Sequence, residues 1–392
     1  MFGRAFRYLS ACVALAAGEA CAALVPSGAE AWMALVLAAS WVALLGYGFA
    51  VRGWPLICVF LAGAALYFRA SVEEERGFRE RPWLRNVACV RQSAPPSRLR
   101  RDLSERVGLG LGQRRETANL NRALLLGERR SIPKAARQVF VDSGTVHVFA
   151  ISGLHVMAVA EVFTLCLAFL LVPVRFAGLV SAPLLWGYVA MIGFAPSAVR
   201  AGMMATIMGV APVFWRRASG LRAWELTFLI VHIATPLMIT NVGNALSFAV
   251  MLAIVLAGDY ARSMSRWRQT LLVTIAAWAT GVPISAHIFG RVTPGGMIGN
   301  LVLIATAKLT VVSGAFGILT SYVSETLAAH INNLSALGIK SMVLVAEGVS
   351  RLPGANFETG AWSILTCVEW YAALALIGFL LWMVTERRRA LG

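Results

Sequence analysis

The sequence is short of acidic residues and of the groups from which catalytic and metal sites are built. Its 392 residues include 19 aspartates and glutamates against 35 lysines and arginines, and only Asp102, Asp142 and Asp259 are aspartates. It contains no HxHxDH motif to ligate two metals, and no GxxxxGK[ST] loop to hold the phosphates of ATP. Its six cysteines show no CxxC or CxxH spacing. We therefore expect no catalytic residues, no metal and no cofactor.

Charge is also scarce along most of the chain, and long apolar runs take its place. Charged residues make up 14% and hydrophobic residues 58% of the sequence, and the mean hydropathy is +0.71. A helix satisfies its own backbone hydrogen bonds in lipid, so these runs predict an all-α integral membrane protein, a polytopic bundle of about 10–12 transmembrane helices. The candidate spans are 9–25, 31–50, 54–68, 147–172, 176–195, 198–215, 222–241, 244–257, 269–289, 296–320 and 362–384, with a weaker amphipathic stretch at 338–350.

Arginine supplies most of the net charge of +16, and its distribution predicts a topology. With the N-terminus inside, alternation places four arginine-containing connections inside, as the positive-inside rule predicts: 52, 175, 216–222 and 262–268. The arginines at 387–389 should also lie inside, which requires either an extra crossing at 338–350 or one crossing fewer. We favour the extra crossing.

Three regions follow from this pattern: transmembrane helices at 1–68, a basic extramembrane segment at 69–122 and a second transmembrane domain at 123–392. The basic segment holds thirteen arginines and seven acids, and helix is expected at 98–126. It is either a solvated linker or a basic surface for an anionic polymer, and it carries no stripe of aromatic residues for base stacking. The candidate DNA-contacting residues are Arg98, Arg100, Arg101, Arg114 and Arg115.

The most informative stretch reads ALLLGER at 123–129 and FVDSGTVHVFAISGLHV at 140–156. This stretch resembles the signature that opens the competence domain of the ComEC family, in which a short amphipathic helix and an SGT.H turn precede AISGLHV at the start of a membrane helix. Further blocks follow in the family's order: GFAPSAVRA at 193–201, NALSF at 244–248 and IFGRV through GNL at 288–301. The resemblance covers roughly residues 123–320 and is looser beyond them.

The resemblance implies a channel that conducts single-stranded DNA inward across the bacterial cytoplasmic membrane during natural transformation. It also implies membrane lipid and single-stranded DNA as partners, a separate DNA receptor outside and a cytoplasmic translocase ATPase. Two departures are visible. The 69–122 segment is too short for the family's complete OB-fold region, and no metallo-β-lactamase-like domain follows the transmembrane part.

Polar groups inside apolar runs are the candidate site residues. Gly153, between Ser152 and His155, weakens a helix that begins near His147, and a broken helix exposes backbone dipoles where it lines a cavity. The alternative is a packed glycine beside a hydrogen-bonded histidine. The candidate translocation path comprises Ser152, Gly153, His155, Ser197, Arg200 and Lys308. Glu161, Glu225 and His232 are candidates for polar pore residues or for an internal ion pair.

Two other functions remain open. A transporter of small molecules or lipids fits the reduced external region, although no inverted repeat supports it. An intramembrane hydrolase would use Ser152 and His155, but Glu161 lies about 240° around the helix from His155, and no oxyanion motif is visible.

Overall fold

The computed structural model describes residues 98–112, 114–128, 132–149, 152–235, 238 and 241–391. The expected spans at 9–25, 31–50 and 54–68, and residues 69–97 of the basic segment, lie outside the described residues. The described elements are α5 (Arg98–Val107), α6 (Arg115–Leu126), α7 (Lys134–Asp142), η3 (Val146–Phe149), α8 (Gly153–Phe169), α9 (Val174–Met191), α10 (Pro196–Val210), η4 (Ala211–Phe214), α11 (Gly220–Ala234), α12 (Val242–Tyr260), η6 (Ala261–Ser263), α13 (Arg266–Phe289), β1 (Arg291–Val292), α14 (Pro294–Ser321), α15 (Glu325–Ser350), β2 (Phe357–Glu358) and α16 (Ile364–Leu391).

The described chain is all-α, and its apolar helices identify a polytopic membrane protein. Five helical segments are long and apolar enough to cross a membrane: α9, α10 with η4, α12 with η6, α13 and α14. Two shorter apolar stretches, Gly153–Phe169 and Ile364–Gly378, lie in α8 and α16. Pro196 and Pro294 open α10 and α14 at positions that need no intrahelical donor, whereas Pro183 and Pro283 lie inside α9 and α13.

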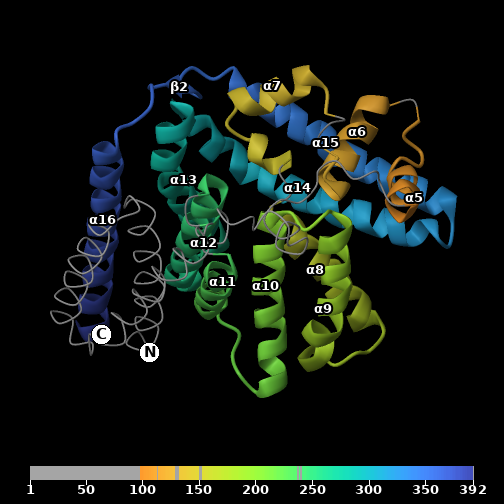
Figure 1. Cartoon of the computed structure of the whole chain (residues 1–392), viewed down its shortest axis with the longest axis horizontal. Helices are drawn as coiled ribbons and strands as arrows, with labels where there is room; N and C mark the ends of the chain where they lie inside the picture. Colours follow the sequence, from red (N-terminus) through yellow and green to blue (C-terminus); the bar gives the residue numbers. More distant parts are fainter. Residues whose placement is uncertain are drawn as a thin grey trace, which may run out of the picture.

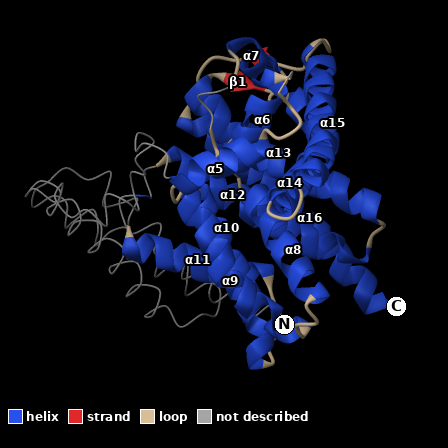
Figure 2. Cartoon of the chain, turned by 90° about the vertical axis from the view of Figure 1, so that its right-hand side faces the viewer, coloured by secondary structure: helices blue, strands red, loops and turns tan. Residues whose placement is uncertain are grey.

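The helices form two groups that meet at the middle of α14, around Leu303, Ala307 and Val311. Helices α8, α9, α10, α12, α13 and α16 run up and down the view, α11 lies across them, and α14 and α15 run obliquely across the upper part (Figures 1 and 2). Figure 2 shows α7 and β1 at the same upper end. The main core lies where the groups meet and contains Leu124, Leu125 and Leu126 of α6 with buried residues of α8, α9, α14 and α15.

Helices α14 and α15 form an antiparallel hairpin whose two ends meet. The strand pair β1–β2 joins the residues just before α14 to those after α15, with Arg291 opposite Glu358 and Val292 opposite Phe357. Because the two ends of the hairpin are paired, α16 begins at the level where α13 ends. In Figure 1 the C-terminus accordingly lies at the lower end, like the α10–α11 connection with its arginines.

Helix α15 is longer than the stretch expected at 338–350, because it begins at Glu325. Its first half carries Asn332 and Ser335, which lower the local hydropathy, yet both side chains are buried against other helices. Asn332 Nδ2 donates to the backbone oxygens of Arg106 and Leu109 at 2.9 and 3.1 Å, and Ser335 Oγ donates to Asn121 Oδ1 at 2.9 Å. α15 is not among the helices apolar enough to span by composition. The expected extra crossing at 338–350 therefore stays a prediction.

Candidate functional site

The SGT turn that precedes α8 is fixed against the start of α14. Gly144 has φ +72°, a left-handed conformation that favours glycine. A Cβ atom at this position would lie 2.5 Å from Cβ of Thr293, so the close approach also requires glycine. The neighbouring Ser143 and Thr145 are fully buried and share a hydrogen bond of 2.6 Å between their hydroxyl groups. The SGT turn and the start of α14, which are far apart in the sequence, thus pack directly against each other and form one joint.

The expected interruption near Gly153 is confirmed, and it lies just before the glycine. The short 3₁₀ helix η3 ends at Phe149, and α8 begins at Gly153 with Ser152 as its N-cap. The Ser152 backbone N–H donates to His155 Nδ1 at 3.2 Å, and Ser152 Oγ lies 3.0 Å from the same nitrogen. The Ser152 hydroxyl also accepts from the His155 backbone N–H, so the two residues form a capping box in which histidine takes the usual place of glutamate or glutamine.

Three of the candidate path residues surround one small cavity between α8, α10 and α12. The cavity has a volume of about 20 Å³, and Gly153, Ser197 and Arg200 line it together with Ser247 and Phe248. This volume is enough for a single water molecule. The structure therefore brings the SGLH and PSAVR motifs together at the top of the bundle.

Arg200 is held at this cavity by neutral acceptors. Its Nε donates to Ser247 Oγ at 3.1 Å, one terminal nitrogen donates to Asn244 Oδ1 at 3.0 Å, and the other donates to the Gly243 carbonyl at 3.4 Å. Only 7% of the Arg200 residue is exposed. A charge buried this deeply needs hydrogen bonds at each nitrogen, and here every guanidinium nitrogen has an acceptor.

The network continues from Arg200 into α11. Asn244 Nδ2 lies 3.1 Å from His232 Nε2, and His232 Nδ1 lies 2.9 Å from the Phe228 carbonyl oxygen. His232 and Phe228 have ring centroids 4.0 Å apart, and Phe248 packs edge-on against Phe228. Hydrogen bonds and rings thus connect α10, α11 and α12. Asn244 and Ser247 lie in the NALSF block but were not among the expected site residues, although polar residues three apart in an apolar helix are a usable signal.

Two of the other candidate ionisable residues pair with each other. Lys308 of α14 forms an ion pair with Glu161 of α8, with 2.8 Å between Nζ and the carboxylate oxygens. Of the two roles expected for Glu161, the ion pair is the one observed. Glu225 is buried on α11, with 2% exposure, on the same helix as His232.

The described part of the basic segment is a pair of packed helices. Arg98, Arg101, Arg114 and Arg115 are exposed, whereas Arg100 is half-buried and donates to the Leu126 carbonyl at 3.0 Å. The expected helix at 98–126 is divided by a turn between α5 and α6. The expected boundary between 122 and 123 falls inside α6. Whether the exposed arginines bind DNA stays a prediction.

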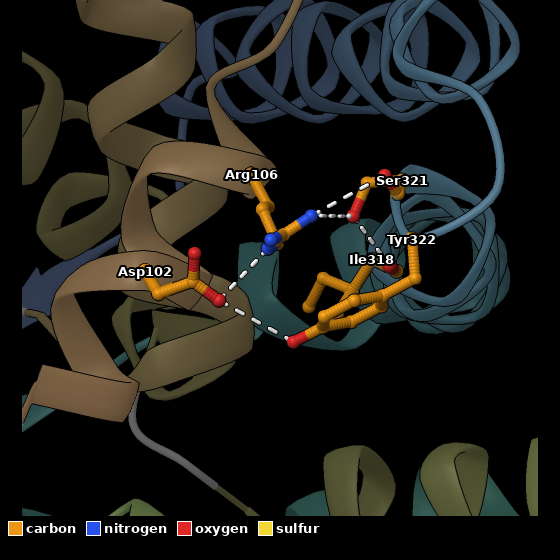
Figure 3. Close-up of polar contacts among 5 residues, drawn as sticks. All are labelled: Asp102, Arg106, Ile318, Ser321 and Tyr322. Atoms are coloured by element: carbon orange, nitrogen blue, oxygen red, sulfur yellow. Dashed lines mark hydrogen bonds and ion pairs between the residues drawn. The ribbon is translucent and has the colours of Figure 1, made fainter.

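Figure 3 shows how α5 is attached to the end of α14. Arg106 Nε forms an ion pair with Asp102 at 2.8 Å, and another nitrogen of Arg106 donates to the Ser321 hydroxyl and carbonyl at 3.1 and 3.3 Å. The guanidinium also lies 4.0 Å from the centroid of the Tyr322 ring. A cation at the last carbonyls of a helix compensates the helix dipole, so this contact favours docking of α5 on α14.

Acid is expected to loosen this attachment. The hydrogen bonds that Arg106 and Tyr322 donate hold the pKa of Asp102 below its ordinary value. A carboxyl with a depressed pKa stabilises the folded state above its unfolded pKa, near 4, and this contribution is lost as the pH falls through the folded pKa. Hydrogen-exchange protection at 103–107 should therefore fall between pH 6 and pH 3, relative to α14. Asp102→Asn should show reduced protection already at pH 6 and little further change in acid; an undiminished pH response in that variant would contradict the assignment.

The part of the chain that contains these motifs is similar to known proteins. A family model described as "Competence protein" matches residues 124–384. ComE operon protein 3 of Bacillus subtilis (strain 168) is 24% identical over 202 residues, which cover 51% of this chain and 26% of that protein. The uncharacterized protein YcaI of Escherichia coli (strain K12) is 23% identical over 280 residues, which cover 67% of this chain and 36% of that protein. The chain thus spans only a minor part of the length of these curated relatives, and no solved structure matches it.

Proposed function

The chain belongs to the competence protein family, a family of membrane proteins associated with DNA uptake, and from that premise we propose that it forms a channel for inward translocation of single-stranded DNA. The bacterial cytoplasmic membrane is the proposed location, and a separate DNA receptor and a cytoplasmic translocase ATPase are proposed partners. One observation carries the proposal. Gly153 of the SGLH motif and Arg200 line one small cavity between membrane helices, and non-helical backbone such as that before α8 is tolerated at membrane depth only beside a cavity or inside protein.

The surroundings of Gly153 indicate that the size of the side chain at this position decides whether the cavity stays open. A Cβ atom on Gly153 would lie 3.3 Å from the terminal methyl of Met251 and 3.5 Å from Cβ of Ala201. Met251 ends in a flexible thioether, so alanine can be accommodated, whereas leucine would fill the cavity and displace its neighbours. A passage at this point should therefore tolerate Gly153→Ala and be closed by Gly153→Leu.

The test compares transformation frequency and membrane abundance in a strain that depends on this protein. We expect Gly153→Leu to abolish uptake at normal abundance, Gly153→Ala to retain it, and His155→Gln to have an intermediate effect. Gly187→Leu is the matched control, because a side chain on Gly187 of α9 meets open space. Normal uptake by stably inserted Gly153→Leu protein would refute the channel proposal.

Two other patterns identify the rival explanations. If Gly153 serves only packing, abundance should fall in proportion to uptake. If Ser152 and His155 form a hydrolase pair, Ser152→Ala and His155→Gln should each be as damaging as Gly153→Leu. As a cap alone, Ser152→Ala should cost only about 1 kcal/mol of helix stability.

A further inference from the structure

The ion pair between Glu161 and Lys308 lies in an unusual position. Each residue stands near the middle of an apolar helix, Glu161 in α8 and Lys308 in α14. The side chains nevertheless remain 50% and 45% exposed on the described surface. Charged groups at such a depth are costly in lipid and normally face a partner, the bundle interior or water. This pair therefore marks a surface that meets something polar.

The surroundings of the ion pair do not supply that polarity. On α8 the exposed neighbours are Met157, Thr164 and Leu165, and on α14 they include Val302 and Leu309. Thr164 contributes a single hydroxyl, which is already bonded to the Ala160 carbonyl at 2.8 Å. Among these described neighbours, the ion pair is the charged feature of an apolar face. A polar ligand that reaches this face would meet Lys308 and Glu161 first.

A cavity adjoins the pair on the α8 side. It has a volume of about 470 Å³ and lies between α8, α9 and α10, with Glu161, Ser181 and Thr206 among its lining residues. Glu161 thus contacts Lys308 and also lines a cavity large enough for a chemical group of nucleotide size. The cavity alone is mostly apolar, so the ion pair supplies its charge.

Lys308 and Arg200 differ in their availability to a phosphate. Arg200 is 7% exposed and has an acceptor at every guanidinium nitrogen. Lys308 is held by one carboxylate, and half-exposed ion pairs of this kind contribute only about 0–1 kcal/mol. An ammonium has three donors and can exchange one acceptor for another at little cost. Lys308 is therefore the cation that an incoming anion can recruit.

Building on the channel function proposed above, we infer that the Glu161–Lys308 pair is a latch that a phosphodiester group displaces. In the resting state the Glu161 carboxylate neutralises the Lys308 ammonium, so the pair carries no net charge. A passing phosphate takes the place of the carboxylate on Lys308, and the freed Glu161 repels the polyanion, which keeps the contact weak enough for the strand to leave. Lys308 contacts the phosphodiester backbone of the strand, so the contact is independent of base sequence.

The test measures binding of a fluorescent single-stranded oligonucleotide to the full chain in nanodiscs of neutral lipid, over a range of salt. Lys308→Gln should weaken binding and reduce the slope of log affinity against log salt by about 0.7, the value for one phosphate contact on a single strand. Glu161→Gln should strengthen binding, because Lys308 loses its competitor. Arg291→Gln is the matched control, since it removes one positive charge from another exposed ion pair, with Glu358.

The outcomes separate the latch from its alternatives. Opposite effects of Lys308→Gln and Glu161→Gln on binding support it. A purely structural pair would give two variants with lower thermal stability and unchanged salt slope, and the exchange Glu161→Lys with Lys308→Glu would restore both stability and uptake; that pattern overturns the latch. If phosphatidylglycerol in the nanodisc abolishes the dependence on Lys308, the phosphodiester bound there is a lipid headgroup and the inference fails. Failure of the wild-type protein to bind at low salt would instead count against the channel function.

Discussion

Asn244→Leu is expected to remove most of the folded protein from the membrane. Leucine cannot accept the hydrogen bond that Arg200 donates to Asn244 Oδ1, so a guanidinium that is 7% exposed would lose a principal acceptor. Leaving a buried donor without its acceptor costs about 1–3 kcal/mol and more when the donor is charged, which is a large part of a domain's stability. Membrane abundance and the thermal midpoint in detergent are the measurements.

The double variant distinguishes the loss of a hydrogen bond from the stranding of a charge. Arg200→Met removes the guanidinium together with its desolvation cost, so Arg200→Met/Asn244→Leu should accumulate better than Asn244→Leu alone. Ser247→Ala is a milder comparison, because it removes one hydroxyl acceptor, at about 1 kcal/mol. A double variant as depleted as Asn244→Leu would show that Asn244 acts through His232 instead of Arg200.

Gly144→Ala should also cause a large loss of stability, for two separate reasons. An alanine at φ +72° is strained by about 1–2 kcal/mol, and its Cβ would collide with Thr293, where overpacking adds about 1–3 kcal/mol. The joint between the SGT turn and α14 would open, and the protein should be depleted from the membrane. Gly187→Ala, which places a methyl group in open space on α9, should be tolerated.

A second substitution separates the two terms. Thr293→Gly removes the atoms that the new Cβ would meet, and the hydrogen bond from Trp278 Nε1 to the Thr293 carbonyl is retained because it uses the backbone. Gly144→Ala/Thr293→Gly should therefore regain the stability that the collision with Thr293 costs, while the loss from backbone strain at residue 144 remains. If the double variant is no more stable than Gly144→Ala, the collision contributes nothing measurable and the joint depends on backbone conformation alone.

The long, mostly apolar helices were predicted well from the sequence. The spans expected at 176–195, 269–289 and 296–320 correspond to α9, α13 and α14 within a few residues at each end. α15 shows where this approach fails. Asn332 and Ser335 are buried because they form hydrogen bonds with groups on α5, α6 and α14. A hydropathy scale scores such polar residues as exposed, whereas here their polarity serves internal packing.

The candidate site was predicted only in part, because its partners come from distant parts of the sequence. The SGLH motif indicated a helix interruption, and local capping by Ser152 and His155 explains why that prediction succeeded. No local pattern could show that Arg200 meets Asn244, or that Glu161 meets Lys308, which lies 147 residues away. Such pairs depend on which helices become neighbours, and that is decided by packing of the whole bundle.

The closed ends of the α14–α15 hairpin have a consequence for biosynthesis. α13 and α16 are neighbours in the fold, with Trp370 Nε1 donating to the Ala279 carbonyl at 2.9 Å and Tyr371 Oη donating to the Thr280 carbonyl at 2.9 Å. The contact between His287 and Trp362 joins residues 75 positions apart. At roughly 5–20 residues per second, a ribosome needs about 4–15 s to make this interval. During that time α13 is already synthesised while α16 is not, so the α13 surface that α16 will cover must be shielded by lipid or by an insertion factor.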